Sequence, residues 1–319
     1  MSENRTLLTD MAEGLFAELT GADFAVSWPR LAEAGFATLL VAEEQGGFGG
    51  DWGDLFAVLR LAGQQALSAP LGETIVAHKL LADAGVAAPE GPIVLLDRDY
   101  ASFGRHSAAM LAAGEGGLRL YRNSACSFVE GASPDGNPRD KVNFTGEPTA
   151  TFASNADLRA KGAFVRVAMA TGALEAGFAL AIEHVNTRVQ FGKPLGKFQA
   201  VQQALAEASS EIAAVGAVGQ AAAAAFDAGD AGFEIAAAKW RMNCAIEVAV
   251  PILHRVHGAI GFTMEYPLNR HTRSLMGWRS EFGNDAYWAR TLGERAAKLG
   301  GAGLWREITA RGDRKTSMG

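Results

Sequence analysis

A run of residues with phosphate-binding chemistry interrupts a helical, alanine-rich part of the sequence. The run "RVQFGKPLGKFQAVQQ" covers residues 188–203. The guanidinium of Arg188 can hold a phosphate through two hydrogen bonds, and the ring of Phe191 offers a flat face to a heteroaromatic base. Lys193 adds positive charge, and the first turn of a following helix leaves N–H groups free for an anion. These residues predict a site for an aromatic diphosphate, such as the ADP half of a dinucleotide.

The same run also has a purely structural interpretation. Gly192 and Pro194 break the helical pattern, so the run can simply join two helices. In that case Phe191 belongs to the core, and Arg188 and Lys193 are solvated. The run by itself leaves both interpretations open.

Long helices are needed on both sides of the run to position it, and the sequence supplies them. Apolar periodicity and helix-breaking residues predict helices near residues 155–188, 197–228, 231–257 and 284–299. Helices of this length with short connections pack as an antiparallel bundle, and alanine-rich faces allow close approach. Helical patterns also fill the chain up to about residue 85. Between residues 91 and 147, short segments rich in β-branched and aromatic residues predict about four strands.

The sequence therefore predicts a mainly α protein with a small β insert. We expect an N-terminal helical domain over residues 1–88, a reduced β-domain over 89–153 and a C-terminal helical bundle over 154–319. A chain of 319 residues has room for this organisation. We find no internal repeat.

Composition and charge exclude several classes of protein. Hydrophobic residues make up 49% of the chain and charged residues 20%, which is ordinary for a globular protein. A formal net charge of -6 favours no nucleic-acid partner. Cys126 and Cys244 suggest neither a disulfide framework nor a zinc site, and His254 and His257 have no further ligand at metal-binding spacing. No signal peptide or membrane-spanning run is apparent, so we expect a cytoplasmic protein without metal or membrane contact.

Three segments resemble the acyl-CoA dehydrogenase family. "TRVQFGKPLGKFQAVQ" and "HGAIGFTMEYPLNRHTR" are similar to its two C-terminal signatures. "LAEAGFATLLVAEEQGGFGG" resembles its N-terminal helical domain, with Ala42 where proline is usual. The resemblance implies a helical domain, a central β-domain and a C-terminal four-helix bundle, assembled as dimers or tetramers that hold FAD. We read the second segment, from His257 to Ser274, as a glycine-containing loop.

By resemblance, the first signature contacts the ADP portion of an FAD whose ring is seated in a neighbouring subunit. The matching positions are Arg188, Gln190, Phe191, Leu195, Phe198 and Gln199. Further cofactor contacts implied by the resemblance are Arg255, Gly258 and Asn284. Arg255 stands where glutamine is usual and Ala259 where a second glycine is usual, which weakens the match of this loop.

The residues that serve a chain's own flavin and its proton abstraction match poorly. The usual catalytic glutamate falls on Phe282, which cannot accept a proton, and an alternative position on the helix before Arg188 falls on Gly162. Glu281 is a weak substitute, because one helical step swings a side chain by about 100°. The β-domain also lacks the family segments that line the flavin ring.

This asymmetry predicts the reduced subunit of a two-gene acyl-CoA dehydrogenase, similar to the α2β2 enzymes of bacterial steroid side-chain breakdown. A full-length partner would supply the base, the flavin-ring pocket and the acyl-CoA site. Two alternatives stay open: a self-sufficient homo-oligomer that uses Glu281, and a non-catalytic scaffold on the same fold. We also expect Trp278, Tyr287 and Trp288 at a subunit interface, because interfaces favour aromatic residues.

Overall fold

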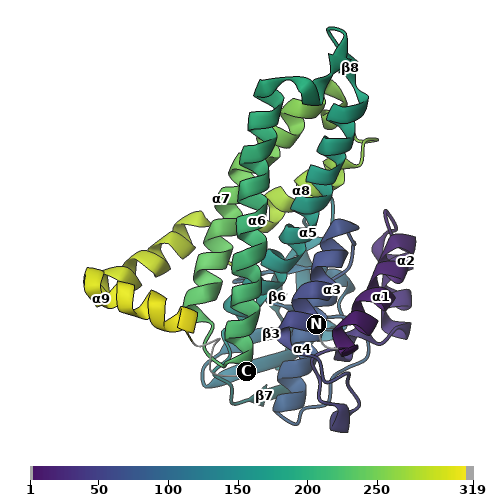
Figure 1. Cartoon of the computed structure of the whole chain (residues 1–319). Helices are drawn as coiled ribbons and strands as arrows, with labels where there is room; N and C mark the ends of the chain where they lie inside the picture. The colour runs from purple at the N-terminus through teal and green to yellow at the C-terminus, as the bar shows by residue number, and fades with distance from the viewer. Residues whose placement is uncertain (1–2, 314–319) are drawn as a thin grey trace.

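A computed structural model describes residues 3–313 and places helices before and after a region of short strands. Figure 1 shows the N-terminal helices beside the strands and the long C-terminal helices extending away from both. The helices that precede the strands are α1 (Glu3–Glu18), α2 (Phe24–Glu33), α3 (Trp52–Gln64) and α4 (Leu71–Asp83). The third of these helices begins at a capping box, in which Asp51 and Asp54 each bond the backbone N–H of the other.

The strands form two small sheets. They are β1 (Ile93–Leu95), β2 (Tyr100–Ser102), β3 (Ala109–Gly114), β4 (Gly117–Arg122), β5 (Cys126–Val129), β6 (Arg139–Phe144) and β7 (Ala150–Phe152). One sheet has the order β1-β3-β4-β7 and the other β2-β6-β5. β1 and β3 are parallel, with Val94 opposite Met110, and the other pairs of these two sheets are antiparallel.

The prediction of about four strands was too low. β2 and β7 are only three residues long, and β3 has the sequence AMLAAG, whose alanines favour a helix over a strand. β3 is nevertheless held as a strand, because it pairs with β1 on one side and β4 on the other. Tertiary pairing here overrides local propensity.

The helices after the strands match the predicted ones closely, with one addition. They are α5 (Leu158–Thr187), α6 (Gln199–Asp227), α7 (Gly232–His257), α8 (Leu268–Trp278) and α9 (Asp285–Asp313). The prediction of a loop from His257 to Ser274 was wrong over its last part, which forms the start of α8. This helix buries Leu268, His271, Thr272 and Leu275, at the spacing of one helical face.

The last helix runs further than predicted. α9 continues past residue 299 to Asp313, with a kink at Gly300, where φ is 65° and ψ is 168°. Figure 1 shows α9, in yellow, leaving the bundle and folding back on itself. α9 packs against α7, and near its end Arg311 donates to Glu234 of α7 at 2.8 Å.

α5 is the central helix of the fold. It packs against α3, α4, α6, α7 and α8. A Cβ atom built on Gly172 would lie 1.8 Å from the Arg60 carbonyl oxygen, and one on Gly63 would lie 1.9 Å from that of Met169, so α3 and α5 touch backbone to backbone. α5 is long and apolar enough to cross a membrane, but 67% of its most apolar window is buried inside the protein, as in a core helix.

Candidate functional site

The predicted phosphate-binding run forms a hairpin at the tip of the bundle. β8 (Val189–Gln190) pairs with β9 (Lys193–Pro194), and a 3₁₀ turn, η5 (Leu195–Lys197), leads into α6. The two residues at the bend, Phe191 and Gly192, have φ values of 52° and 79°. Positive φ at both positions is typical of a two-residue hairpin turn.

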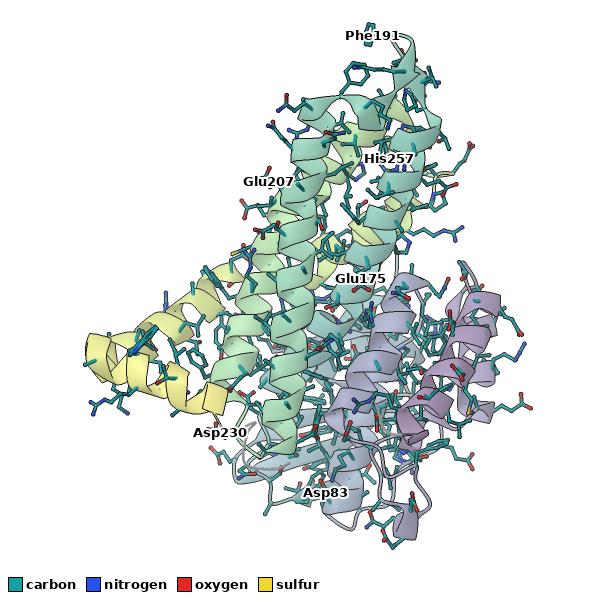
Figure 2. All side chains as sticks on the ribbon, in the orientation of Figure 1. Asp83, Glu175, Phe191, Glu207, Asp230 and His257 are labelled. Atoms are coloured by element: carbon teal, nitrogen blue, oxygen red, sulfur yellow. The ribbon has the colours of Figure 1, made fainter. Side chains whose placement is uncertain are left out.

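The side chain of Phe191 extends into solvent from this tip, as Figure 2 shows. It is 91% exposed, so the interpretation that places Phe191 in the core is wrong. The ring centroid of Phe198 lies 6.2 Å from that of Phe191, and the Lys193 amino nitrogen lies 4.3 Å from the Phe198 ring. Arg188 is exposed as well, and none of the carboxylates in residues 3–313 forms an ion pair with it. The tip therefore combines free cations with an exposed aromatic ring.

The second signature lies at the same end of the bundle. The His184 ring, one turn before Arg188, stacks on the His257 ring with centroids 4.8 Å apart. His257 directly precedes Gly258, whose φ is 66°, and Arg255 is exposed beside it. Burial lowers the pKa of His184, and the nearby charges of His257 and Arg188 lower it further. The stacked rings thus hold the end of α5, just before the first signature, against the start of the second.

The remaining predicted contacts of the first signature differ in exposure. Leu195 and Phe198 are half-buried, and Leu195 packs against the core. Gln190 and Gln199 are exposed. The backbone N–H of Leu195 donates to the Arg188 carbonyl at 2.9 Å, which closes the base of the hairpin.

Asn284 is not brought to the tip with the other predicted contacts. Its Oδ1 accepts a hydrogen bond from the Tyr287 backbone N–H at 3.0 Å, so it caps α9. The neighbouring Gly283 is bound by Lys239, which lies 18 positions before His257 on α7. That separation corresponds to roughly 27 Å along the helix axis.

The two positions where the family places its base meet each other inside the protein. Phe282 is 3% exposed, and a Cβ atom on Gly162 would lie only 2.3 Å from its ring. The Phe282 N–H donates to Asp97 at 2.7 Å, and its carbonyl accepts from the Trp288 indole at 3.1 Å. The phenyl ring therefore occupies the space into which a side chain at residue 162 would extend.

Glu281, the weak candidate for a base, is buried in an ion-pair network. Its carboxylate accepts from Arg166 Nε at 2.6 Å, and Arg139 Nε lies 3.5 Å away. Arg166 also pairs with Glu73, on α4. Burial by itself would lower the pKa of Arg166, but the charges of Glu73 and Glu281 outweigh burial and raise it. A carboxylate bound this firmly to a guanidinium is poorly placed to accept a proton from a substrate.

The space beside this network is too small for a flavin ring or an acyl chain. Glu73, Ser102, Arg166, Met169 and Glu281 line a cavity of only about 20 Å³. A cavity of this volume has room for about one water molecule. These residues leave no room for an isoalloxazine, whereas the open tip carries a guanidinium at Arg188 and an exposed ring at Phe191, groups that can contact a nucleotide phosphate and base.

Lys239 fixes the turn that carries Glu281 and Phe282. Its buried amino group donates to the carbonyl oxygens of Trp278, Arg279 and Gly283 at 3.0 to 3.2 Å. Two of these carbonyls lie at the C-terminal end of α8, where carbonyls have no partner within the helix, and Asn243 also donates to that of Arg279 at 3.3 Å. Burial lowers the pKa of Lys239 to about 7.

Sequence reasoning missed Glu73, Arg166 and Lys239. One signal for Arg166 was a single cation inside the apolar run "GAFVRVAMATGA", because a charge there needs a buried partner. The predicted interface role of Trp278 and Trp288 was wrong. They are 8% and 3% exposed and belong to the core of this chain.

Comparison with known proteins agrees with the fold and with the signatures. Residues 160–297 match the model of the acyl-CoA dehydrogenase C-terminal domain. The acyl-CoA dehydrogenase IpdE2 of Mycobacterium tuberculosis is 29% identical over 263 residues, which cover 78% of this chain and 80% of the relative. IpdE2 of Mycolicibacterium smegmatis is 26% identical over 260 residues, covering 78% and 81%.

Solved structures show the same fold. The steroid acyl-CoA dehydrogenase variant Tcur3481-Tcur3483 matches with a TM-score of 0.82 and 22% identity, over 93% of this chain and 98% of the matched chain. The ChsE4-ChsE5 complex of Mycobacterium tuberculosis matches with a TM-score of 0.81 and 19% identity, over the same shares of both chains. The architecture is thus that of an acyl-CoA dehydrogenase, as predicted.

Residues 160–297 thus match the acyl-CoA dehydrogenase family, which confirms the resemblance drawn from the signatures. This family comprises FAD-dependent oxidoreductases that act on CH–CH bonds.

Proposed function

We propose that this chain is a subunit of a paired acyl-CoA dehydrogenase and completes the FAD site of a catalytic partner. The complex would carry out α,β-dehydrogenation of an acyl-CoA thioester. The observation that carries the proposal is the closed state of the chain's own site, where the ring of Phe282 fills the space over Gly162. A chain whose site at Glu281 and Phe282 has no room for flavin or substrate, but which presents an open, cationic tip, is suited to serve a neighbour.

At the tip, each predicted residue has a defined role. Arg188 would grip the pyrophosphate, and Phe191 would stack on the adenine, with Gln190 and Gln199 exposed beside them. Arg255 and Gly258 would approach the same end of the cofactor. A bound FAD would supply the acceptor for the hydride of the β carbon. The proton from the α carbon would go to a carboxylate of the partner subunit.

The relatives support a proposal for the acyl group and for the assembly. One matched structure is named as a steroid acyl-CoA dehydrogenase, and another is a complex of two different chains. We therefore propose a bulky or steroid-type acyl group, a role in lipid or steroid catabolism and an α2β2 heterotetramer in the cytoplasm. We retain the predicted domains, 1–88, 89–153 and 154–319.

Two alternatives make different predictions. A self-sufficient homo-oligomer would need Glu281 as its base, which requires Arg166 to release it and the closed cavity to open. A scaffold on the same fold would bind no flavin, even beside a dehydrogenase partner.

Visible absorption spectra separate these functions. The chain is purified alone and after co-expression with a full-length acyl-CoA dehydrogenase encoded beside its gene. We expect a colourless lone chain and a yellow complex that oxidises an acyl-CoA substrate. Stoichiometric flavin on the lone chain would contradict the paired-subunit proposal. A colourless complex would favour the scaffold.

A further inference from the structure

Lys161 lies beside a cavity at the end of the bundle opposite Phe191. The residue belongs to the first turn of α5 and is half-buried. The cavity has a volume of about 560 Å³ and is lined by the end of α4, the segment after β7 and the α6–α7 connection. Figure 2 labels Asp83 and Asp230 at this end of the molecule.

The amino group of Lys161 is held by aromatic rings. Its nitrogen lies 4.5 Å from the centroid of the Trp52 ring and 5.0 Å from that of Phe226. Across residues 3–313, no protein acceptor hydrogen-bonds this amino group and no carboxylate lies within ion-pair distance of it. Aromatic faces replace only part of the hydration of an ammonium ion, so the neutral amine is favoured relative to a lysine in water.

The acidic residues around the cavity are engaged elsewhere. Asp83 pairs with Lys79 at 2.5 Å and Asp230 with Arg311 at 3.0 Å. Asp157 caps α5 by accepting from the Ala160 N–H at 3.1 Å. Burial lowers the pKa of Lys161 to about 8, and the charges of Asp83 and Asp157 offset only part of that effect.

We propose that Lys161 is an acylation site that reacts with acyl-CoA thioesters. The neutral amine attacks the thioester carbonyl carbon, the N–C bond forms and the C–S bond breaks. The CoA sulfur leaves and takes up the proton lost by nitrogen, and no electrons are exchanged with an oxidant. Leu80, Phe152 and Ile235 give the cavity apolar walls for the acyl chain. The reaction requires only this chain and a thioester of the kind that the family uses, so it is independent of the paired-subunit proposal.

Acetyl-CoA is the probe that tests this site. The full chain is incubated with it at about pH 7.5, and acetylation of each lysine is followed by mass spectrometry. Lys141, which is exposed on β6, is the internal reference. With a pKa near 8, roughly a quarter of the amine is neutral, against about one part in a thousand for an ordinary lysine. A less basic amine is a weaker nucleophile and the cavity limits access, so we expect about a tenfold faster reaction at Lys161.

Two further measurements identify the cause of the preference. The rate at Lys161 should level off above about pH 9, because roughly nine-tenths of the amine is then neutral. The preference over Lys141 should disappear in denaturing urea, since the cavity no longer exists. Equal or slower acetylation of Lys161 in the folded chain would overturn the proposal. A preference that persists in urea would overturn it as well, because it would reflect local sequence alone.

Discussion

Three charged side chains, Glu73, Arg166 and Glu281, meet in the interior of the protein. They lie beside Phe282, which stands at the position that the resemblance gives to the catalytic base. All three are at most 3% exposed. Buried charges are tolerated when each is paired and hydrogen-bonded, and here the one guanidinium serves both carboxylates. The network closes the cavity and joins α4, α5 and the turn after α8.

If Glu281 is a structural partner of Arg166, replacing it should cost stability. Glu281→Gln keeps the shape but removes a buried charge, and breaking such a pair costs about 3 kcal/mol. Urea unfolding followed by circular dichroism measures the change. Glu175→Gln is the matched control, because the Arg60–Glu175 pair is partly exposed and should contribute less than about 1 kcal/mol.

The Glu281→Gln experiment also distinguishes the paired-subunit proposal from the self-sufficient homo-oligomer. Equal, small effects of Glu281→Gln and Glu175→Gln on unfolding would argue against the structural role. If Glu281→Gln also abolished dehydrogenation by the lone chain without unfolding it, Glu281 would be the base.

His271, on α8, makes stability depend on pH. Burial lowers its pKa to about 4, below the value of about 6.5 for an unfolded chain. The unfolded state therefore binds more protons between these values. The contribution of His271 is complete above about pH 6.5 and is lost as pH falls toward 4. The full loss is about 3 kcal/mol.

Unfolding free energies at several pH values between 7 and 4.5 test this linkage. Carboxylates also titrate there, so the informative quantity is the difference in slope between the wild type and His271→Gln. The variant should have the shallower slope. His106→Gln, at an exposed position, should leave the slope unchanged. A slope unaffected by His271→Gln would contradict the assignment.

At the scale of elements, α5 approaches the turn after α8 closely because Gly162 has no side chain. Gly162→Ala would place a Cβ atom 2.3 Å from the ring of Phe282, which is held by its bonds to Asp97 and Trp288. Overpacking of this kind costs about 1–3 kcal/mol, against a gain in helix propensity of at most about 1 kcal/mol. We expect a net loss, measured by thermal or urea unfolding.

Gly216→Ala is the control for that substitution. Gly216 lies in α6, and the nearest atom to its Cβ would be a Thr171 methyl at 3.7 Å, an ordinary contact. The alanine should therefore be neutral or stabilising by up to about 1 kcal/mol. If Gly162→Ala were as stable as Gly216→Ala, Phe282 would not close this site as rigidly as the structure indicates.

The properties of individual helices and strands explain which parts of the fold could be predicted from the sequence. α5, α6 and α7 follow the 3.6-residue period over many turns, and glycine or proline ends them, so their bounds were predicted within three residues. α8 was missed because three residues of its buried face, His271, Thr272 and Ser274, are polar. β3 was missed because its strand state depends on its neighbours.

The candidate site also has one part that could be predicted from the sequence and one that could not. The tip was predictable because Arg188, Phe191 and Gly192 are adjacent in sequence and form one local hairpin. The Glu73–Arg166–Glu281 network was not, because its members are separated by 93 and 115 positions and meet only through packing of the helices. A site formed by residues that are adjacent in sequence can be predicted from a local motif. A cavity closed by residues far apart in sequence depends on how the whole chain packs.

For the molecule as a whole, the closed region and the open tip lie at different points along the bundle. The turn with Phe282 is tied to the lower part of α7 through Lys239, and Phe191 projects from the far end (Figure 2). A chain built this way would reach the FAD only at the tip, away from its own closed site. Substitutions at the tip should therefore change cofactor binding by the complex without changing the folding of the chain.

Arg188→Ala and Phe191→Ala test that separation. Each should weaken FAD retention by the co-expressed complex about ten- to a hundredfold, because a phosphate contact or an aromatic stack contributes about 1–3 kcal/mol. Flavin release on dilution, followed by fluorescence, gives the measurement. The loss from Arg188→Ala should shrink at high salt, where its contact with phosphate is screened. The unfolding midpoint of the lone chain should not move, because both side chains are exposed.

Val189→Ala is the matched control on the same hairpin, since Val189 is 54% exposed and carries neither charge nor ring. It should retain flavin like the wild type. If all three variants retained flavin equally, the tip would not contact the cofactor. If all three lost it equally, the hairpin would act through its shape and not through Arg188 and Phe191. Selective loss in the two predicted variants, with an unchanged lone chain, is the result that a shared FAD site requires.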